Sequence, residues 1–105
     1  MKQLYTIDQI QSIVVPIVKE HGASSVSLFG SYAKGTADKH SDIDLKIDKG
    51  RLKTLFQIIA LRLELEDALK KPVDPVTSDS NDKGFLDTIS KEEVLLYREQ
   101  YETNI

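Results

Sequence analysis

The stretch SLFGSYAKGTADKHSDIDLKI, residues 27–47, decides the fold of this chain. A short apolar strand ends at Gly30-Ser31, and eleven residues after that serine two aspartates, Asp42 and Asp44, alternate along a second strand. Residues i and i+2 of a strand share a face, so both carboxylates project to one side while their apolar neighbours point into the core. Adjacent carboxylates repel each other unless a cation lies between them. Because hard oxygen ligands select magnesium or manganese, the stretch predicts a metal-bound nucleotide.

The Gly-Ser turn has the features that a triphosphate needs. Gly30 lets the backbone approach a phosphate closely, and Ser31 offers both a hydroxyl and an N–H group. Residues 32–34 can begin a short helix whose positive end faces the anion, and Gly35 then ends it. The turn is therefore predicted to bind the phosphates of the nucleotide.

A Gly-Ser turn, a short helix and Asp-x-Asp on the next strand resemble the nucleotidyltransferase superfamily of DNA polymerase β. More narrowly, GSYAKG followed by SDIDL looks like the minimal nucleotidyltransferases, the MNT proteins encoded beside HEPN-domain partners. The resemblance implies an α/β (α+β) fold of the polymerase β type, a small mixed β-sheet flanked by helices. It implies that Gly30 and Ser31 hold phosphates while Asp42 and Asp44 bind Mg²⁺, two ions being expected. Lys34 stands where the family often has arginine, so it keeps the charge for the phosphates but loses the bidentate fork.

A third carboxylate is expected in such a site, because the attacking hydroxyl benefits from a base and the metals from another ligand. Asp74, within KPVDPVT at 71–77, is the candidate for either role. The two prolines confine this segment to a short edge-type strand. The family usually has leucine after this aspartate, so Pro75 is a departure that removes one ladder donor. An alternative places Asp74 in a turn before the proline.

A second interpretation of the acidic strand needs no site at all. Alternating polar residues usually face solvent, so Asp42 and Asp44, with Lys46 and Asp48, fit the wet face of an amphipathic edge strand. That interpretation leaves the Gly-Ser turn unexplained, and the site is therefore the favoured prediction.

Composition limits what else the chain can be. Its 105 residues, 40% of them apolar, predict a single domain over 1–105 with one modest core and no second lobe to hold an acceptor. The net charge is −3 and no basic stripe with interleaved aromatics is present, so direct nucleic-acid binding is not expected. There is no cysteine, no signal-peptide pattern and no apolar run of membrane-spanning length. A cytoplasmic protein is expected.

The helix predicted from about residue 52 to 69 is apolar on two nearly opposite sides. One stripe comprises Leu52, Leu55, Phe56, Ile59 and Leu63, and the other comprises Ile58, Leu61, Leu65 and Leu69. Both cannot face so small a core. We expect one stripe to dock on a partner or on a second copy of the chain, with burial under the C-terminal segment as the alternative. Further on, residues 85–89 predict a short helix, and 93–97 predict either a strand or a final helical turn.

The resemblance implies a Mg²⁺-dependent transferase that moves a nucleoside monophosphate, AMP from ATP, onto a hydroxyl. In MNT relatives that act as antitoxins the acceptor is a tyrosine of the cognate HEPN ribonuclease, so a helical HEPN-domain partner is expected. Two alternatives stay open. One is an antitoxin that neutralises its partner by stoichiometric docking with weak or no catalysis, and the other is a subunit that adenylylates a small molecule such as an aminoglycoside.

Overall fold

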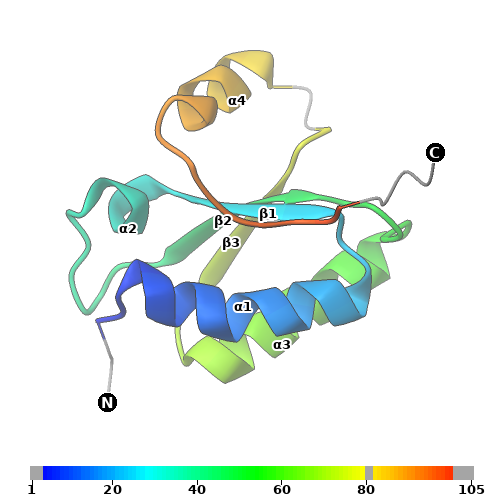
Figure 1. Ribbon diagram of the computed structural model, residues 1–105, viewed down its shortest axis with the longest axis horizontal. Coiled ribbons are helices and arrows are strands. Elements are labelled where there is room, and N and C mark those ends of the chain that lie inside the picture. The colour runs from blue at the N-terminus through cyan, green and yellow to red at the C-terminus, as the bar shows by residue number, and fades with distance from the viewer. Residues whose placement is uncertain (1–3, 80–81, 101–105) are drawn as a thin grey trace.

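The computed structural model describes residues 4–79 and 82–100. A four-stranded mixed sheet lies at its centre, in the order β3-β2-β1-β4 (Figure 1). The strands are β1 (Ser25–Phe29), β2 (Ile43–Asp48), β3 (Val73–Thr77) and β4 (Val94–Arg98), and the helices are α1 (Ile7–His21), α2 (Gly30–Lys34), α3 (Leu55–Leu69) and α4 (Lys83–Ser90). β1 pairs antiparallel with β2 and β4, whereas β3 runs parallel to β2. The predicted fold class, a small mixed sheet flanked by helices, is confirmed.

β2 is a central strand, and this position decides between the two interpretations of its acids. It pairs with β1 along one side and with β3 along the other, so it cannot be the edge strand that the solvent-face interpretation required. Its burial alternates strictly, with Ile43, Leu45 and Ile47 buried and the polar residues between them half-buried. That edge-strand alternative is therefore wrong.

The sheet has helices on both faces. α1 and α3 cover one face, and α4 lies over the other (Figure 1). The core forms on the α1/α3 side, where side chains of both helices meet the apolar residues of the strands, among them Val14, Leu28, Leu45 and Leu65. The polar residues of β2 point to the α4 side. The apolar core and the acidic residues of β2 therefore lie on opposite faces of one sheet.

α1 begins where its sequence provides a cap. The Thr6 side chain accepts a hydrogen bond from the Gln9 N–H at 3.1 Å, and the Gln9 side chain accepts one from the Thr6 N–H at 2.9 Å. This reciprocal capping box satisfies two N–H groups that a helix start leaves unpaired. At the other end Gly22, at φ 89°, closes the helix in the left-handed conformation.

α3 starts three residues later than the prediction. Thr54 and Gln57 form a second capping box, which fixes the start at Leu55. Leu52 lies in the preceding turn and is 4% exposed, so the prediction that it belongs to the outer stripe is wrong and it belongs to the core. The rest of that stripe faces outward, with exposed fractions of 70% for Leu55, 84% for Phe56, 41% for Ile59 and 59% for Leu63.

The C-terminal segment resolves the remaining alternatives. Residues 94–98 form a strand, because β4 pairs with β1 and adds the second outer strand of the sheet. α4 confirms the prediction of a short helix over residues 85–89. Since β4 lies across the sheet from α3, the described C-terminal residues do not cover the outer stripe of that helix, and the burial alternative is wrong for them. Within residues 4–79 and 82–100, no helix combines the length and apolar character needed to cross a membrane.

Candidate active site

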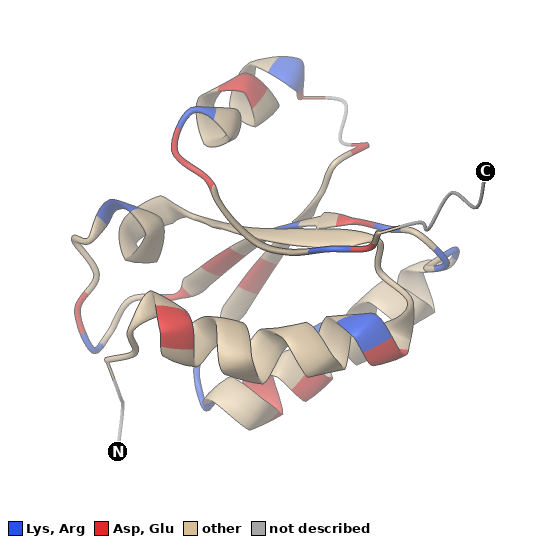
Figure 2. Ribbon diagram, in the orientation of Figure 1, with Lys and Arg blue, Asp and Glu red and all other residues tan. Residues whose placement is uncertain are grey.

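Three strand ends meet at the acidic edge of the sheet. β1 ends at Phe29, which is opposite Asp44 in the antiparallel register, and Asp44 is in turn opposite Asp74 in the parallel register. Asp42 lies one residue before β2 begins. Figure 2 shows the acidic residues of β2 and β3 side by side. The structure therefore brings the predicted carboxylates to one edge, and it places Asp74 in a strand, so the turn alternative for this residue is wrong.

Gly30 touches Asp44 in a way that only glycine permits. Its φ is +74°, in the left-handed region, and a Cβ built on it would lie 3.1 Å from the Asp44 Cγ and collide with Oδ2. The backbone of the Gly-Ser turn is therefore in close contact with the carboxylate of Asp44. The two halves of the motif, eleven residues apart from Ser31 to Asp42, form one site because this contact joins them.

Asp44 is the carboxylate whose protonation is most affected by the fold. Burial, followed by the charges of Asp74 and Asp42, raises its pKa from 3.8 to about 6. The cause is the low local dielectric together with two like charges, and both disfavour the ionised form. A cation bound at this edge would remove the repulsion.

The donor chemistry of these residues fits a divalent metal, although their side chains are not gathered as a ready-made cage. Among the described residues, no three or more His, Cys, Asp or Glu side chains already form a group that could hold a metal ion. The oxygen-only donors and the raised pKa of Asp44 nevertheless match Mg²⁺, which binds proteins through one or two carboxylates and takes its other ligands from water and phosphate.

The metal-free protein is expected to lose stability as pH rises through about 6. The pKa of Asp44 is higher folded than unfolded, so the stabilising contribution is complete below pH ~4 and disappears as the folded group ionises. After discounting for solvent screening we expect about 1 kcal/mol. Urea unfolding in chelator from pH 4 to 7.5 measures this, with Asp44→Asn as the comparison. A constant difference between the two proteins across this range would contradict the prediction.

The residues predicted to bind phosphate match the prediction only in part. Ser31 is half-buried in α2, and Gly35, at φ 79°, ends that helix as predicted. Lys34, by contrast, is exposed and its Nζ lies 3.3 Å from a carboxylate oxygen of Glu92. A phosphate would have to compete with this acid for the Lys34 charge, so the role of Lys34 stays a prediction.

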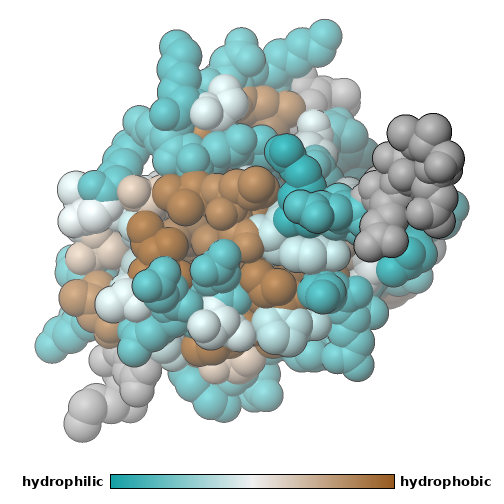
Figure 3. Space-filling view, in the orientation of Figure 1, coloured by the Kyte–Doolittle hydropathy of each residue, from teal (hydrophilic) through white to brown (hydrophobic). Residues whose placement is uncertain are grey.

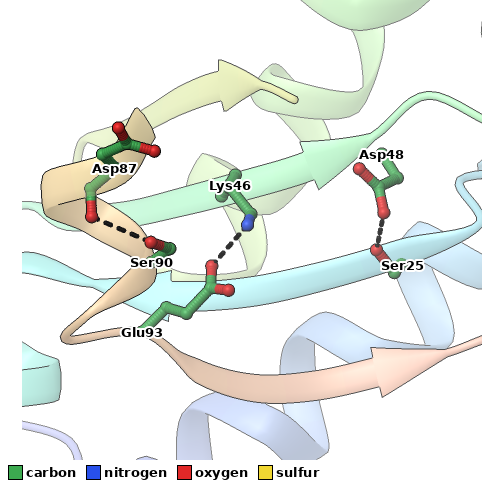
Figure 4. Close-up of polar contacts among 6 residues, drawn as sticks. All are labelled: Ser25, Lys46, Asp48, Asp87, Ser90 and Glu93. Atoms are coloured by element: carbon green, nitrogen blue, oxygen red, sulfur yellow. Dashed lines mark hydrogen bonds and ion pairs between the residues drawn. The ribbon is translucent and has the colours of Figure 1, made fainter. Parts of the chain in front are cut away.

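Further along the α4 side of the sheet, polar residues form an ion pair and hydrogen bonds with one another (Figure 4). Lys46, two residues after Asp44, places its Nζ 2.6 Å from Glu93, and the Ser25 hydroxyl donates to Asp48. Burial raises the pKa of Asp48, but the hydrogen bonds from Ser25 and Ser78 and the nearby bases outweigh it and leave the pKa lowered. β2 thus carries Asp48, whose charge is stabilised by hydrogen bonds, at one end and Asp44, whose charge is disfavoured by burial and by neighbouring acids, at the other.

Lys71 is a part of this region that the sequence analysis missed. It is 4% exposed, and its ammonium donates to the backbone carbonyls of Lys39 at 2.6 Å and of Ser41 at 3.4 Å. It also lies 5.9 Å from the centre of the Tyr32 ring. The loop that leads to Asp42 is therefore anchored by a buried charge. No sequence signal distinguishes this lysine from the exposed Lys70 beside it.

Lys71→Met is expected to loosen the loop that carries Asp42. Misplacement of a reacting group by about 1 Å costs roughly 100-fold, so we expect kcat to fall about 100-fold. The Mg²⁺ concentration for half-maximal rate should rise, while the KM for the nucleotide changes less. Lys70→Met is the matched control, since Lys70 is exposed and pairs with Asp67. Equal kinetics for the two variants, or a loss explained by unfolding in circular dichroism, would rule out a positioning role.

Two hollows in the described surface lie away from the carboxylates. The larger, about 410 Å³, runs along α1 and is lined by residues such as Tyr5 and Ile13. The smaller, about 160 Å³, is lined by Tyr32, Gly35 and Ala37 behind α2. Neither is lined by Asp42, Asp44 or Asp74, so the acidic residues of the candidate site lie outside both hollows.

Residues 11–102 match the family described as "Polymerase beta, Nucleotidyltransferase". The chain is 38% identical over 88 residues to the protein MJ0435 of Methanocaldococcus jannaschii, covering 84% of this chain and 95% of that one, which carries the provisional name protein adenylyltransferase. It is 33% identical over 95 residues to the protein adenylyltransferase MntA of Thermococcus cleftensis, covering 87% of this chain and 96% of the relative.

Solved structures share the fold. A crystal structure of a toxin–antitoxin with AMP-PNP contains a chain with a TM-score of 0.75 at 23% identity, covering 86% of this chain and 74% of that one. A tri-AMPylated Shewanella oneidensis HEPN toxin in complex with an MNT antitoxin gives 0.69 at 18%, covering 87% and 71%. These structures show the fold, and the match to the family model together with the sequence relatives establishes that the chain belongs to the polymerase β nucleotidyltransferase family, alongside the MntA adenylyltransferases.

Proposed function

We propose that this enzyme transfers AMP from ATP to a tyrosine hydroxyl of a helical HEPN-domain partner, and that the modification silences the partner as part of a toxin–antitoxin pair. One observation carries the proposal. The bare Cα of Gly30 lies against the Asp44 carboxylate, which has Asp74 beside it in the sheet. This arrangement joins a phosphate-binding turn to a set of acids, as nucleotidyl transfer requires.

The identity of the nucleotide and of the acceptor in this proposal is inferred from related proteins. One related structure is described with AMP-PNP, an ATP analogue, and another with a HEPN toxin that carries three AMP groups. Two sequence relatives are named as protein adenylyltransferases. These names support ATP as the nucleotide and a HEPN protein as the acceptor.

In the proposed reaction the Gly30-Ser31 turn holds the β and γ phosphates through its N–H groups and the Ser31 hydroxyl. The tyrosine oxygen attacks the α-phosphorus, the bond from that phosphorus to the bridging oxygen breaks, and pyrophosphate leaves. The hydroxyl proton passes to Asp74 or to water. Mg²⁺, held by Asp42 and Asp44 with Asp74 as a further candidate ligand, would neutralise the charge that develops on the phosphates.

The test is transfer of label from α-labelled ATP in the presence of Mg²⁺, with the purified chain incubated in lysate of its own host. A labelled protein band that is lost with Asp44→Asn, and a tyrosine that gains the mass of AMP, would support the proposal. A labelled small molecule without a labelled protein would favour the small-molecule alternative. No label, together with an unmodified partner that co-purifies, would favour the stoichiometric antitoxin.

A further inference from the structure

The outer surface of α3 is apolar and uncovered. We call Leu55, Phe56, Ile59 and Leu63 the outer α3 surface. Scattered exposed apolar residues are ordinary, but these four follow one another along one side of a single helix. With side chains of up to about 200 Å² each, their exposed fractions give a patch of roughly 500 Å². Patches of that size commonly mark an interface.

This surface lies on the wrong side of the molecule to receive an acceptor for its own active site. α3 packs its inner stripe, Leu61 and Leu65, into the core on the face of the sheet opposite Asp44. A molecule docked on the outer α3 surface is therefore separated from Asp44 by the helix and the sheet. The occupant of this surface is not the hydroxyl donor of the same copy.

Two copies of α3 that run antiparallel present complementary residues to each other. Leu55 lies four residues before Ile59, and Leu63 lies four residues after it. Phe56, three residues before Ile59, corresponds to Arg62, three residues after it, so an antiparallel pair brings an aromatic ring near a guanidinium group at each end. The two helix dipoles also oppose each other in that arrangement.

We propose that the outer α3 surface binds a second copy of this chain, through an antiparallel α3–α3 contact with the two-fold axis near Ile59. Self-complementary contacts of this kind are the usual route to dimers. The pair buries roughly 1,000 Å² in total, close to the lower limit for a specific interface, so a dissociation constant on the order of micromolar is expected. Both catalytic edges stay free in the dimer, because they lie on the opposite faces of the two sheets.

Sedimentation equilibrium of the full chain over a range of concentrations tests the proposal. The unmodified protein should dimerise, and Ile59→Asp should weaken the dimer about 100-fold or more, since it places two carboxylates opposite each other at the proposed two-fold axis. Leu95→Asp is the matched control. It adds the same charge to another apolar area, over β4 (Figure 3), at a residue 48% exposed, and should leave the dimer unchanged. Circular dichroism checks that each variant folds.

A cross-link tests the geometry independently of affinity. The chain has no cysteine, so Ile59→Cys introduces a single thiol at the proposed two-fold axis. Under mild oxidation it should form a covalent dimer much faster than Thr88→Cys, an exposed position on α4. A monomeric chain at all concentrations, equal cross-linking of both variants, or a surface covered only by a different protein would each overturn the proposal. None of these outcomes depends on transferase activity.

Discussion

Asp44→Asn is expected to reduce nucleotidyl transfer by about 10³-fold or more, because the reaction depends on negative oxygen ligands that organise the metal and the phosphates. The amide keeps the shape of the side chain and cannot supply the charge. Asp44 is flanked by Gly30 and Asp74, so no neighbouring carboxylate can take its place without moving a strand. The measurement is the initial rate of AMP transfer from labelled ATP at saturating nucleotide and Mg²⁺.

The fold should survive this substitution and even gain stability at neutral pH. The pKa of Asp44 is raised, so its ionised form is unfavourable in the folded protein without metal, and the neutral amide removes that cost. Asp79→Asn is the matched control, since Asp79 is exposed at the far end of β3 and pairs with Lys49. A folded Asp44→Asn protein that retains transfer would refute the assignment of this carboxylate.

Gly30→Ala is expected to abolish most activity through a collision and not through a lost functional group. The added Cβ would overlap Oδ2 of Asp44, and the left-handed φ of +74° adds about 1–2 kcal/mol of strain. Asp44 must move to relieve the overlap, and we expect kcat to fall about 100-fold or more. Steady-state kinetics with a melting curve for the same protein separate the two effects.

Gly35→Ala isolates the backbone strain. Gly35 also has a left-handed φ, 79°, but a Cβ there meets nothing within 4 Å. It should therefore lose similar stability and keep most of its transfer rate. If both variants lose activity equally, strain in α2 is responsible, and the contact between Gly30 and Asp44 is not required.

Much of the site could be predicted from local sequence because its parts are local. Period-two alternation fixed which residues of β2 face the core and therefore on which side its acidic residues lie. Leu52 was misplaced because a helical wheel cannot tell a helix residue from one in the turn before it. Residues 93–97 were ambiguous because a short apolar run fits a strand and a helix equally.

Other features depend on residues far apart in the chain, and no local pattern contains them. Lys71 anchors the loop before Asp42 across about thirty residues, although in sequence it looks like its exposed neighbour Lys70. The parallel register that sets Asp44 beside Asp74 likewise exists only once β3 has paired with β2. Pro75 does not prevent this, because β3 is an outer strand and its far side needs no partner.

The sequence by itself determined the family, the Gly-Ser turn and the acids, because backbone periodicity and a short motif suffice to place them relative to one another. Only the tertiary structure decided that Gly30 contacts Asp44, that burial and the neighbouring carboxylates raise the pKa of that acid, and that the outer stripe of α3 is left uncovered. The physical reason is that contact, dielectric and burial are properties of groups brought together by packing. A sequence pattern can state which groups are available, and the folded chain decides which of them meet.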